Sequence, residues 1–163
     1  MTKYFSCAVP CRNVRSPQET TGGSVEFLVI NYQSVHPKTG KLGEIQIKFP
    51  GGGLKYHHEY PGQTMAREVF EETSLCVYHW KKEWSVEVTS THTQYGFLVD
   101  IDDCLGDMRQ EEMIDDDGDL LSAPYWVRAE VLGHILFPKH LPHYMEACRE
   151  LGIEPASDPN HSP

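Results

Sequence analysis

A group of glutamates in the middle of the chain has the residue types and spacing needed for chemistry. Glu71 and Glu72 follow Glu68 by three and four residues, and residues at these intervals share one face of a helix. If residues 63 to 73 form a helix, the three carboxylates point the same way. The opposite face offers apolar side chains to bury against a sheet, namely Met65, Ala66, Val69 and Phe70.

These carboxylates need a counter-charge, because like charges one helical turn apart repel. A hard divalent cation such as Mg²⁺ removes that cost, since it takes oxygen ligands and usually joins one or two carboxylates to substrate phosphates. Arg67 can brace Glu71 or hold Glu59, which precedes the helix by a Tyr-Pro-Gly turn. The run from Pro50 to Gly53 lets the backbone come close, where a carbonyl can act as a further ligand.

The stretch from Gly53 to Leu75 resembles the Nudix box: a Gly, five residues, a Glu, seven residues, then Arg-Glu-apolar-x-Glu-Glu-x-Gly-apolar. Eight of its nine specified positions are met: Gly53, Glu59, Arg67, Glu68, Val69, Glu71, Glu72 and Leu75. The exception is Ser74, where the family usually has the Gly that supplies a left-handed residue at the helix end. Ser74 either adopts that conformation under modest strain or the helix ends differently. We expect catalysis to survive, because this position has no metal-binding or acid-base role.

This resemblance implies an α/β fold, a Nudix-like α/β/α sandwich with a mixed β-sheet. It also implies an enzyme, a pyrophosphohydrolase that cleaves a phosphoanhydride bond in a nucleoside diphosphate linked to another moiety. Mg²⁺ (or Mn²⁺) would be the cofactor, and a small nucleotide-type diphosphate would be the partner. Dimerisation is common in the family, so a homodimer is a further expectation.

The resemblance also implies a role for each box residue. Glu71 and Glu72 are primary metal ligands, and Glu68 is a ligand or the general base. Glu59 supports the metal cluster, and the carbonyl of Gly52 adds a ligand.

Arg67 orients the glutamates in this scheme. The base varies within the family, and many members bring it, or a further carboxylate, from a loop before a late tryptophan strand. Here that loop is the acidic segment at 102–124. Glu111 and Glu112 are its best candidates, and we expect at least one to reach the site, with Glu112 as a possible catalytic residue. Weaker candidates are Asp115, Asp116, Asp117 and Asp119; the alternative is a solvated charge run.

The sequence does not select the residues that bind the rest of the substrate. His57 and His58 lie in the box loop, where they either touch substrate or form surface. Candidate phosphate-binding cations are Lys48, Lys55, Lys81, Lys82, Arg109 and Arg128. Candidate base-stacking aromatics are Tyr56, Tyr60, Trp80, Trp84 and Tyr95, although core packing is the commoner fate of such residues.

Two other functions stay open. One is a non-catalytic nucleotide-binding sensor of Nudix fold, although such sensors often lose box glutamates. The other is a Nudix-like prenyl diphosphate isomerase, which would need a catalytic cysteine. Cys76 and Cys104 are available, but neither has the expected context.

Composition limits the classes of partner and compartment. The 163 residues favour one Nudix domain at 1–152 followed by a flexible tail at 153–163. A net charge of −10 argues against a nucleic-acid or anionic-membrane surface. No stretch is apolar enough for a membrane helix, and the N-terminus is too polar for a signal peptide. Five scattered cysteines fit a reducing cytoplasm, and neither they nor the histidines have the spacing of a zinc site.

The elements that must position the box can be read from periodicity and turn signals. The first strand contains Pro10, which favours an edge position and makes this strand one candidate dimer contact. Ser24 to Gln33 reads as a central strand and Glu44 to Phe49 as its hairpin partner. The first strand is expected at 4–14, and further strands at 75–80, 84–90, 94–101 and 125–128. A loop is expected at 15–23, and helices at 63–73, 129–136 and 142–151.

Overall fold

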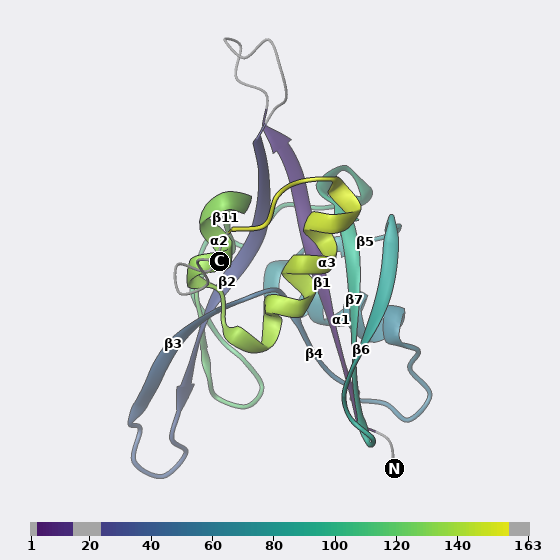
Figure 1. Ribbon diagram of the computed structural model, residues 1–163. Helices are drawn as coiled ribbons and strands as arrows, with labels where there is room; N and C mark the ends of the chain where they lie inside the picture. Colours follow the sequence, from purple (N-terminus) through teal and green to yellow (C-terminus); the bar gives the residue numbers. More distant parts are fainter. Residues whose placement is uncertain (1–2, 15–23, 157–163) are drawn as a thin grey trace, which may run out of the picture.

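The computed structural model describes residues 3–14 and 24–156. In this part of the chain a mixed β-sheet lies between helices on its two faces, α1 behind it and α2 and α3 in front (Figure 1). The expected α/β/α sandwich is therefore confirmed. None of the described helices is long and apolar enough to cross a membrane.

The large sheet runs in the order β6-β7-β1-β2-β10-β9, with β3 and β11 also paired to β2 and β4 to β1. Only β1 and β7 are parallel among these pairs. Its strands are β1 (Lys3–Val14), β2 (Ser24–Val35), β3 (Leu42–Lys48), β4 (Gly51–Gly53), β6 (Lys82–Thr89), β7 (His92–Asp100), β9 (Met113–Ile114), β10 (Leu120–Leu121) and β11 (Tyr125–Arg128). A small second sheet pairs β5 (Cys76–Val77) with β8 (Cys104–Leu105). The helices are α1 (Pro61–Thr73), α2 (Ala129–Ile135) and α3 (Leu141–Leu151), with 3₁₀ turns at Ile101–Asp103 and Pro138–His140.

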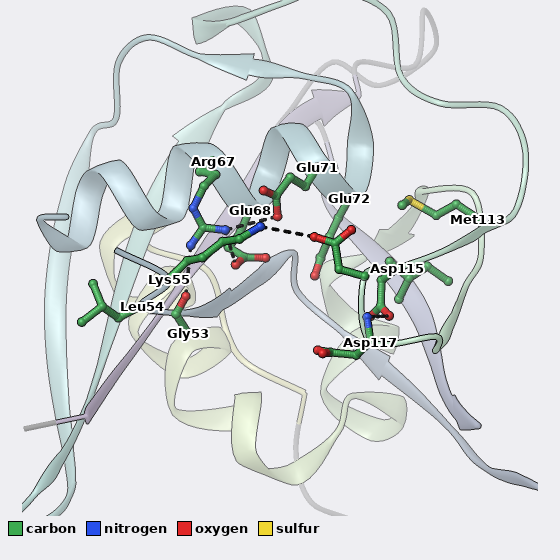
Figure 2. Close-up of a pocket in the computed structure, with 12 residues that line it drawn as sticks. Gly53, Leu54, Lys55, Arg67, Glu68, Glu71, Glu72, Met113, Asp115 and Asp117 are labelled. Carbon is green, nitrogen blue, oxygen red and sulfur yellow. Dashed lines mark hydrogen bonds and ion pairs between the residues drawn. The ribbon is translucent and has the colours of Figure 1, made fainter. Parts of the chain in front are cut away.

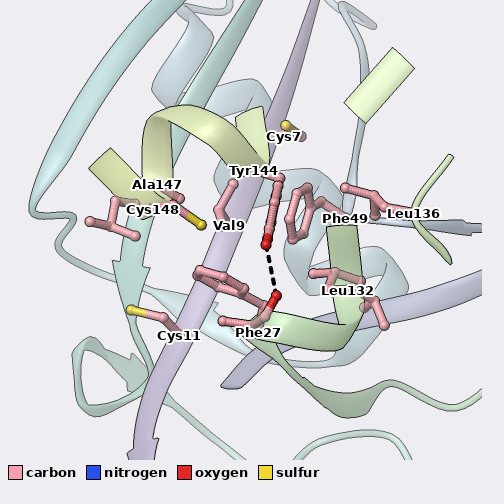
Figure 3. Close-up of a cluster of buried hydrophobic side chains, with 13 residues drawn as sticks. Cys7, Val9, Cys11, Phe27, Phe49, Leu132, Leu136, Tyr144, Ala147 and Cys148 are labelled. Atoms are coloured by element: carbon pink, nitrogen blue, oxygen red, sulfur yellow. Dashed lines mark hydrogen bonds between the residues drawn. The ribbon is translucent and has the colours of Figure 1, made fainter. Parts of the chain in front are cut away.

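Alternation along the central strands divides the core into two layers. Cys7 and Val9 of β1 pack with α2 and α3, whereas Ala8 between them packs with α1. Successive side chains on a strand point to opposite faces, so one apolar strand fills both layers. The layer beside α3 includes Phe27 and Tyr144, and Tyr144 donates its hydroxyl hydrogen to the Ala129 carbonyl at 2.8 Å (Figure 3).

The predicted edge position of the first strand is wrong, because β1 lies inside the sheet. Its first half pairs with β4 and its second half with β2, while β7 pairs with it from Lys3 to Cys11. Ala8 donates its N–H to the Pro50 carbonyl at 2.9 Å. The nitrogen of Pro10, two residues later, therefore faces the same side, where β4 has ended and the pairing with β2 begins at Cys11. The missing donor falls in this gap, so proline is tolerated and β1 offers no edge for a dimer contact.

The predicted apolar face of the box helix is partly wrong. Met65 and Val69 are buried as expected, but Phe70 is 54% exposed. The buried side is completed by Thr64, Thr73 and the carboxylate residue Glu72. The helix is therefore rotated from its expected orientation, with one glutamate turned toward the sheet.

The remaining expected boundaries agree with the structure to within a few residues, and the structure adds short strands and turns that were not expected. The acidic segment contains a short hairpin, β9 and β10, which joins the sheet through β2. The predicted loop at 15–23 lies outside the described residues, as do residues 157–163 of the predicted tail. Ile153 and Ala156 pack against the α3 side of the core, and Ala156 donates its N–H to the Tyr144 hydroxyl at 2.7 Å.

Candidate active site

A cavity of about 530 Å³ lies between α1, the segment that follows β4, and the β9–β10 hairpin (Figure 2). We call it the carboxylate pocket, because most of its charged side chains are acidic. Glu68, Glu71 and Glu72 of α1 form one wall, and Asp115, Asp116 and Asp117 of the hairpin form the other. The remaining lining residues are Gly53, Leu54, Lys55, Arg67, Met113 and Leu121.

The two ends of α1 are fixed locally by its own sequence. At its start, Pro61 occupies the first turn, where no N–H is needed, and the Tyr60 N–H is accepted by Gln63 Oε1 at 2.9 Å. At its end, Ser74 has φ 68° and donates its N–H to the Phe70 carbonyl at 2.9 Å. Ser74 is the only residue other than glycine with positive φ in the described part of the chain. The helix therefore ends as a Nudix box with glycine would, at the cost of backbone strain.

Arg67 contacts three carboxylates at once. Its Nε lies 2.7 Å from Glu59 Oε1, and its Nη1 lies 2.7 Å from Glu68 Oε1 and 3.2 Å from Glu71 Oε2. Nη2 also donates to the Gly53 carbonyl at 3.1 Å. One guanidinium thus contacts three glutamates and ties α1 to the end of β4.

Glu59 has its carboxylate fully engaged by protein groups. Besides Arg67, it accepts from Thr64 Oγ1 at 3.0 Å and from the Lys55 N–H at 3.4 Å. Hydrogen bonding to Arg67 lowers the pKa of Glu59 to about 2. Glu59 does not line the carboxylate pocket, so this geometry favours a bracing role over direct metal binding.

Glu72 is the most enclosed of the three helix glutamates, at 8% exposure. Lys48 Nζ lies 3.2 Å from Glu72 Oε1, and the Gly51 N–H donates to Oε2 at 3.2 Å. Burial nevertheless raises the pKa of Glu72 to about 7, with Lys48 acting in the opposite direction. A bound dication would favour the ionised form, so this carboxylate is suited to a cation. Lys48, a candidate phosphate contact, instead lies beneath the pocket.

Gly52 permits the close approach of Glu68 to the sheet. A Cβ at Gly52 would lie 2.4 Å from the Glu68 carboxyl carbon, a distance that no side chain could occupy. Burial raises the pKa of Glu68, although Arg67 opposes the shift. The role of the Gly52 carbonyl as a metal ligand stays a prediction.

The carboxylates that the hairpin places in the pocket are not the two that the sequence favoured. Glu111 and Glu112 are exposed and do not line the pocket, whereas three aspartates after them do. The reason is the turn: Asp115 Oδ1 accepts the N–H groups of Asp117 and Asp119, both at 2.9 Å. Asp119 itself lies outside the pocket lining, with Oδ1 accepting the Val35 N–H at 2.9 Å. The Asp-rich run closed by Gly118 is the signal that could have predicted this turn.

Arg109 is a positioning residue that sequence reasoning did not identify. Its side chain donates to the carbonyl of Glu72 at 2.6 Å and to that of Ser122 at 2.9 Å. Its own N–H donates to the Thr73 carbonyl at 2.9 Å. Arg109 therefore caps the C-terminal end of α1, where cations are favoured, and joins the two walls of the pocket.

Most other candidates have structural partners. Trp84 donates to His143 Nδ1 at 2.9 Å within the core, Trp80 packs edge-on against Phe97, and Tyr95 against Tyr4. Lys81 pairs with Asp100, Arg128 with Glu130, and Lys55 with Asp116. Tyr56, His57, His58, Tyr60 and Lys82 are exposed.

A metal site would need rearrangement of side chains. Among the described residues, no three Asp, Glu, His or Cys side chains converge on one point, since Arg67 holds Glu68 and Glu71 while Lys48 holds Glu72. The donors themselves fit Mg²⁺ or Mn²⁺, because all are carboxylate oxygens beside an open cavity. A cation would compete with the arginine and lysine for the same oxygens.

Solved structures of Nudix proteins resemble this fold across its length, while no family model and no curated sequence matches the chain. A mutT/Nudix family protein from Listeria innocua is 16% identical, with a TM-score of 0.63 over 91% of this chain and 93% of its own. A C. elegans Ap4A hydrolase is 15% identical, with a TM-score of 0.57 over 91% and 98%. A MutT Nudix hydrolase from Burkholderia pseudomallei is 16% identical, with a TM-score of 0.56 over 88% and 95%. At these identities the likeness establishes the fold: this chain has the Nudix fold.

Proposed function

We propose that this protein is a Nudix hydrolase, a metal-dependent enzyme that cleaves a phosphoanhydride bond in a nucleoside diphosphate linked to another moiety. The observation that carries the proposal is the carboxylate pocket itself. Glu68, Glu71, Glu72 and Arg67 line one cavity on a Nudix fold, opposite a second set of carboxylates. Structural neighbours that hydrolyse nucleotide-type diphosphates, such as the Ap4A hydrolase, support the same reaction.

The proposed metal ligands are Glu71 and Glu72, with the Gly52 carbonyl as an additional donor. Bound Mg²⁺ or Mn²⁺ would neutralise charge on the phosphoryl group and lower the pKa of an attacking water. Glu72 supplies a fixed donor, because Gly51 and Lys48 hold its carboxylate in place. Glu59 acts indirectly, because it holds Arg67 in the position where Arg67 orients Glu68.

Glu68 is the proposed general base. Its partial burial raises its pKa, and a base works best when its pKa lies nearer the working pH. The aspartates Asp115, Asp116 and Asp117 face it from the other wall and are further candidates for the base or for a metal contact. Glu112, an earlier candidate, would have to move into the pocket to take this role.

Neither alternative function gains support from a feature of the pocket. The isomerase would need a reactive cysteine, but Cys76 and Cys104 do not line the pocket. Burial raises the pKa of Cys104 to about 11, which keeps it a thiol at neutral pH. A sensor would not need intact box glutamates.

We also propose a cytoplasmic location, supported by five free cysteine thiols, and leave a homodimer as a proposal without an assigned contact.

The test is turnover by the purified protein with Mg²⁺ or Mn²⁺. The panel comprises nucleoside triphosphates, sugar nucleotides, ADP-ribose, dinucleoside polyphosphates and NADH, with release of nucleoside monophosphate or phosphate as the readout. We expect turnover on at least one class, lost in Glu72→Gln and kept in Glu87→Gln, a matched change on the exposed face of β6. No turnover on any class, while a ligand still raises Tm, would favour the sensor.

A further inference from the structure

A second cavity, of about 370 Å³, shares a wall with the carboxylate pocket. We call it the apolar cavity. Residues 53–55 line both cavities, so a molecule bound over this segment can extend from one into the other. Its volume lies within the range of about 300–1,000 Å³ that small-molecule sites occupy.

The interior of the apolar cavity carries two aromatic side chains and a leucine. Phe5 and Tyr4 come from the start of β1, and Leu54 comes from the shared segment. Phe5 is held in place by the core on one side, where its ring packs edge-on against His140 at 5.7 Å between centroids. Tyr4 is held by its hydroxyl, which donates to the Glu59 carbonyl. Both rings are therefore fixed before any ligand arrives.

The rim of the apolar cavity is basic. Lys3, Lys55, His57 and His92 line it, and the described lining contains no carboxylate. The neighbouring pocket has six carboxylates, so the charge changes sign across residues 53–55. A polyphosphate chain that leaves a metal in the carboxylate pocket would meet cations at this boundary.

We propose that the apolar cavity binds the non-reacting end of the substrate, an aromatic base joined to the reacting diphosphate through at least one further phosphate. The further phosphate lies against the rim cations, and the base lies on Phe5 and Leu54. This inference rests on the proposed hydrolase function and narrows its substrate to compounds with three or more phosphates. Sugar nucleotides fit less well, because the described lining has no Asp, Glu, Asn, Gln, Ser or Thr side chain to bond sugar hydroxyls.

The test compares two substrates and three variants by steady-state kinetics with Mg²⁺. Diadenosine tetraphosphate represents the proposed class, and UDP-glucose represents a diphosphate that ends in a sugar. We expect a KM for the tetraphosphate about tenfold lower, in line with the free energy of stacking one base. Lys3→Ala removes an exposed rim charge and His57→Ala an exposed imidazole that can hydrogen-bond phosphate, and each should raise that KM about threefold with kcat unchanged.

Lys38→Ala is the matched control. Lys38 is an exposed lysine in the turn between β2 and β3 and lines neither cavity. It should leave both KM values as in the parent protein, and the rim variants should leave the KM for UDP-glucose unchanged. Two results would overturn the proposal. One is an equal KM for the two substrates, and the other is an equal change of KM in Lys3→Ala, His57→Ala and Lys38→Ala.

Binding without turnover separates this proposal from the hydrolase itself. Calorimetric titration of diadenosine tetraphosphate with Ca²⁺ in place of Mg²⁺ should give a Kd that rises about threefold in Lys3→Ala and not in Lys38→Ala. That result with no turnover would preserve the apolar cavity and reject the hydrolase. Turnover in which Lys3→Ala changes neither KM nor Kd would support the hydrolase and reject the apolar cavity as a substrate site.

Discussion

The two walls of the carboxylate pocket carry the same charge, but Glu68 and Glu72 of α1 are enclosed whereas Asp116 and Asp117 of the hairpin are exposed. On α1, Glu72 is 8% exposed and Arg67 or Lys48 contacts each glutamate. On the hairpin, the Asp116 side chain is 88% exposed and meets only the exposed Lys55. Enclosed carboxylates are oriented and have shifted pKa values, whereas exposed ones are solvated. The helix wall is thus built to hold a ligand, and the hairpin wall to adjust to one.

The largest difference in kcat should appear when Glu72→Gln on the helix wall is compared with Asp117→Asn on the hairpin wall. Losing a fixed, enclosed ligand should lower kcat by a hundredfold or more, about the effect of removing a key electrostatic group. Losing a solvated aspartate should lower kcat by about tenfold or less. Turnover on the best substrate from the panel measures both.

Thermal melts without metal give the control for this pair. Gln at position 72 removes a charge that burial disfavours, so Tm should not fall. A Glu72→Gln protein with parental kcat, or an Asp117→Asn protein that is the weaker enzyme of the two, would reverse the assignment of the walls.

Arg67→Ala should destabilise the fold, whereas Lys55→Ala should not. Removing Arg67 leaves Glu59 and Glu68 enclosed without their cation, and breaking such a pair costs about 3 kcal/mol. Lys55 leaves only a solvated aspartate. Urea unfolding measures both changes.

Adding Glu59→Gln to Arg67→Ala should recover part of the loss, since it removes the stranded charge. A simple sum of the two single effects would show that the ion pair is not what stabilises this wall.

The pH dependence of stability should differ between the metal-free protein and Glu72→Gln. The folded-state pKa of Glu72 is raised from 4.5 to about 7, so its favourable contribution is complete below pH 4.5 and is lost as pH rises through 7. The loss is about 3 kcal/mol. Urea unfolding in EDTA at pH 5 and pH 7.5 measures it, and Mg²⁺ at pH 7.5 should restore stability.

The buried histidines change the pH dependence of stability in the opposite direction, but they affect both proteins equally. Burial lowers the pKa of His140 to about 3 and that of His143 to about 4, so their contribution is lost as pH falls below 6.5. Both proteins share it, and it cancels in their difference. Parallel pH profiles for the two proteins would show that Glu72 is ionised throughout.

The backbone should give the smallest effect. Ser74→Gly at the end of α1 relieves a left-handed conformation and should raise stability by about 1 kcal/mol, while Gly118→Ala in the hairpin turn, at φ 86°, should lower it by a similar amount. Thermal melting measures both. A lower Tm for Ser74→Gly would mean that its side chain contributes more than the strain costs.

Local patterns predicted the helix wall well. The spacing of the box placed Glu68, Glu71 and Glu72 on one helix face beside Arg67, and the continuous apolar run from Phe27 to Ile30 placed β2 at the centre of the sheet. Those features depend on residues within one or two helical turns, or on the period of a single strand. Their physical causes are therefore visible along the chain.

Long-range features were not predictable in the same way. Pro10 indicates an edge strand unless the change of partner from β4 to β2 is known, and Phe70 reads as core until the rotation of α1 is fixed by the sheet. Glu112 ranked above Asp117 because the hairpin turn that aims the aspartates depends on Tyr32 and Val35 of β2. Each of these errors concerns which distant segment a residue meets.

Arg109 ties the two walls of the pocket together, because one side chain spans from the end of α1 to Ser122, directly after β10. A substrate with a longer or shorter phosphate chain needs a different gap. A single substitution there, remote from every reacting atom, would therefore change which chain length fits. Under the proposed hydrolase function, the length of the phosphate chain that this protein accepts would therefore depend on a residue that bonds backbone carbonyls and does not line the pocket.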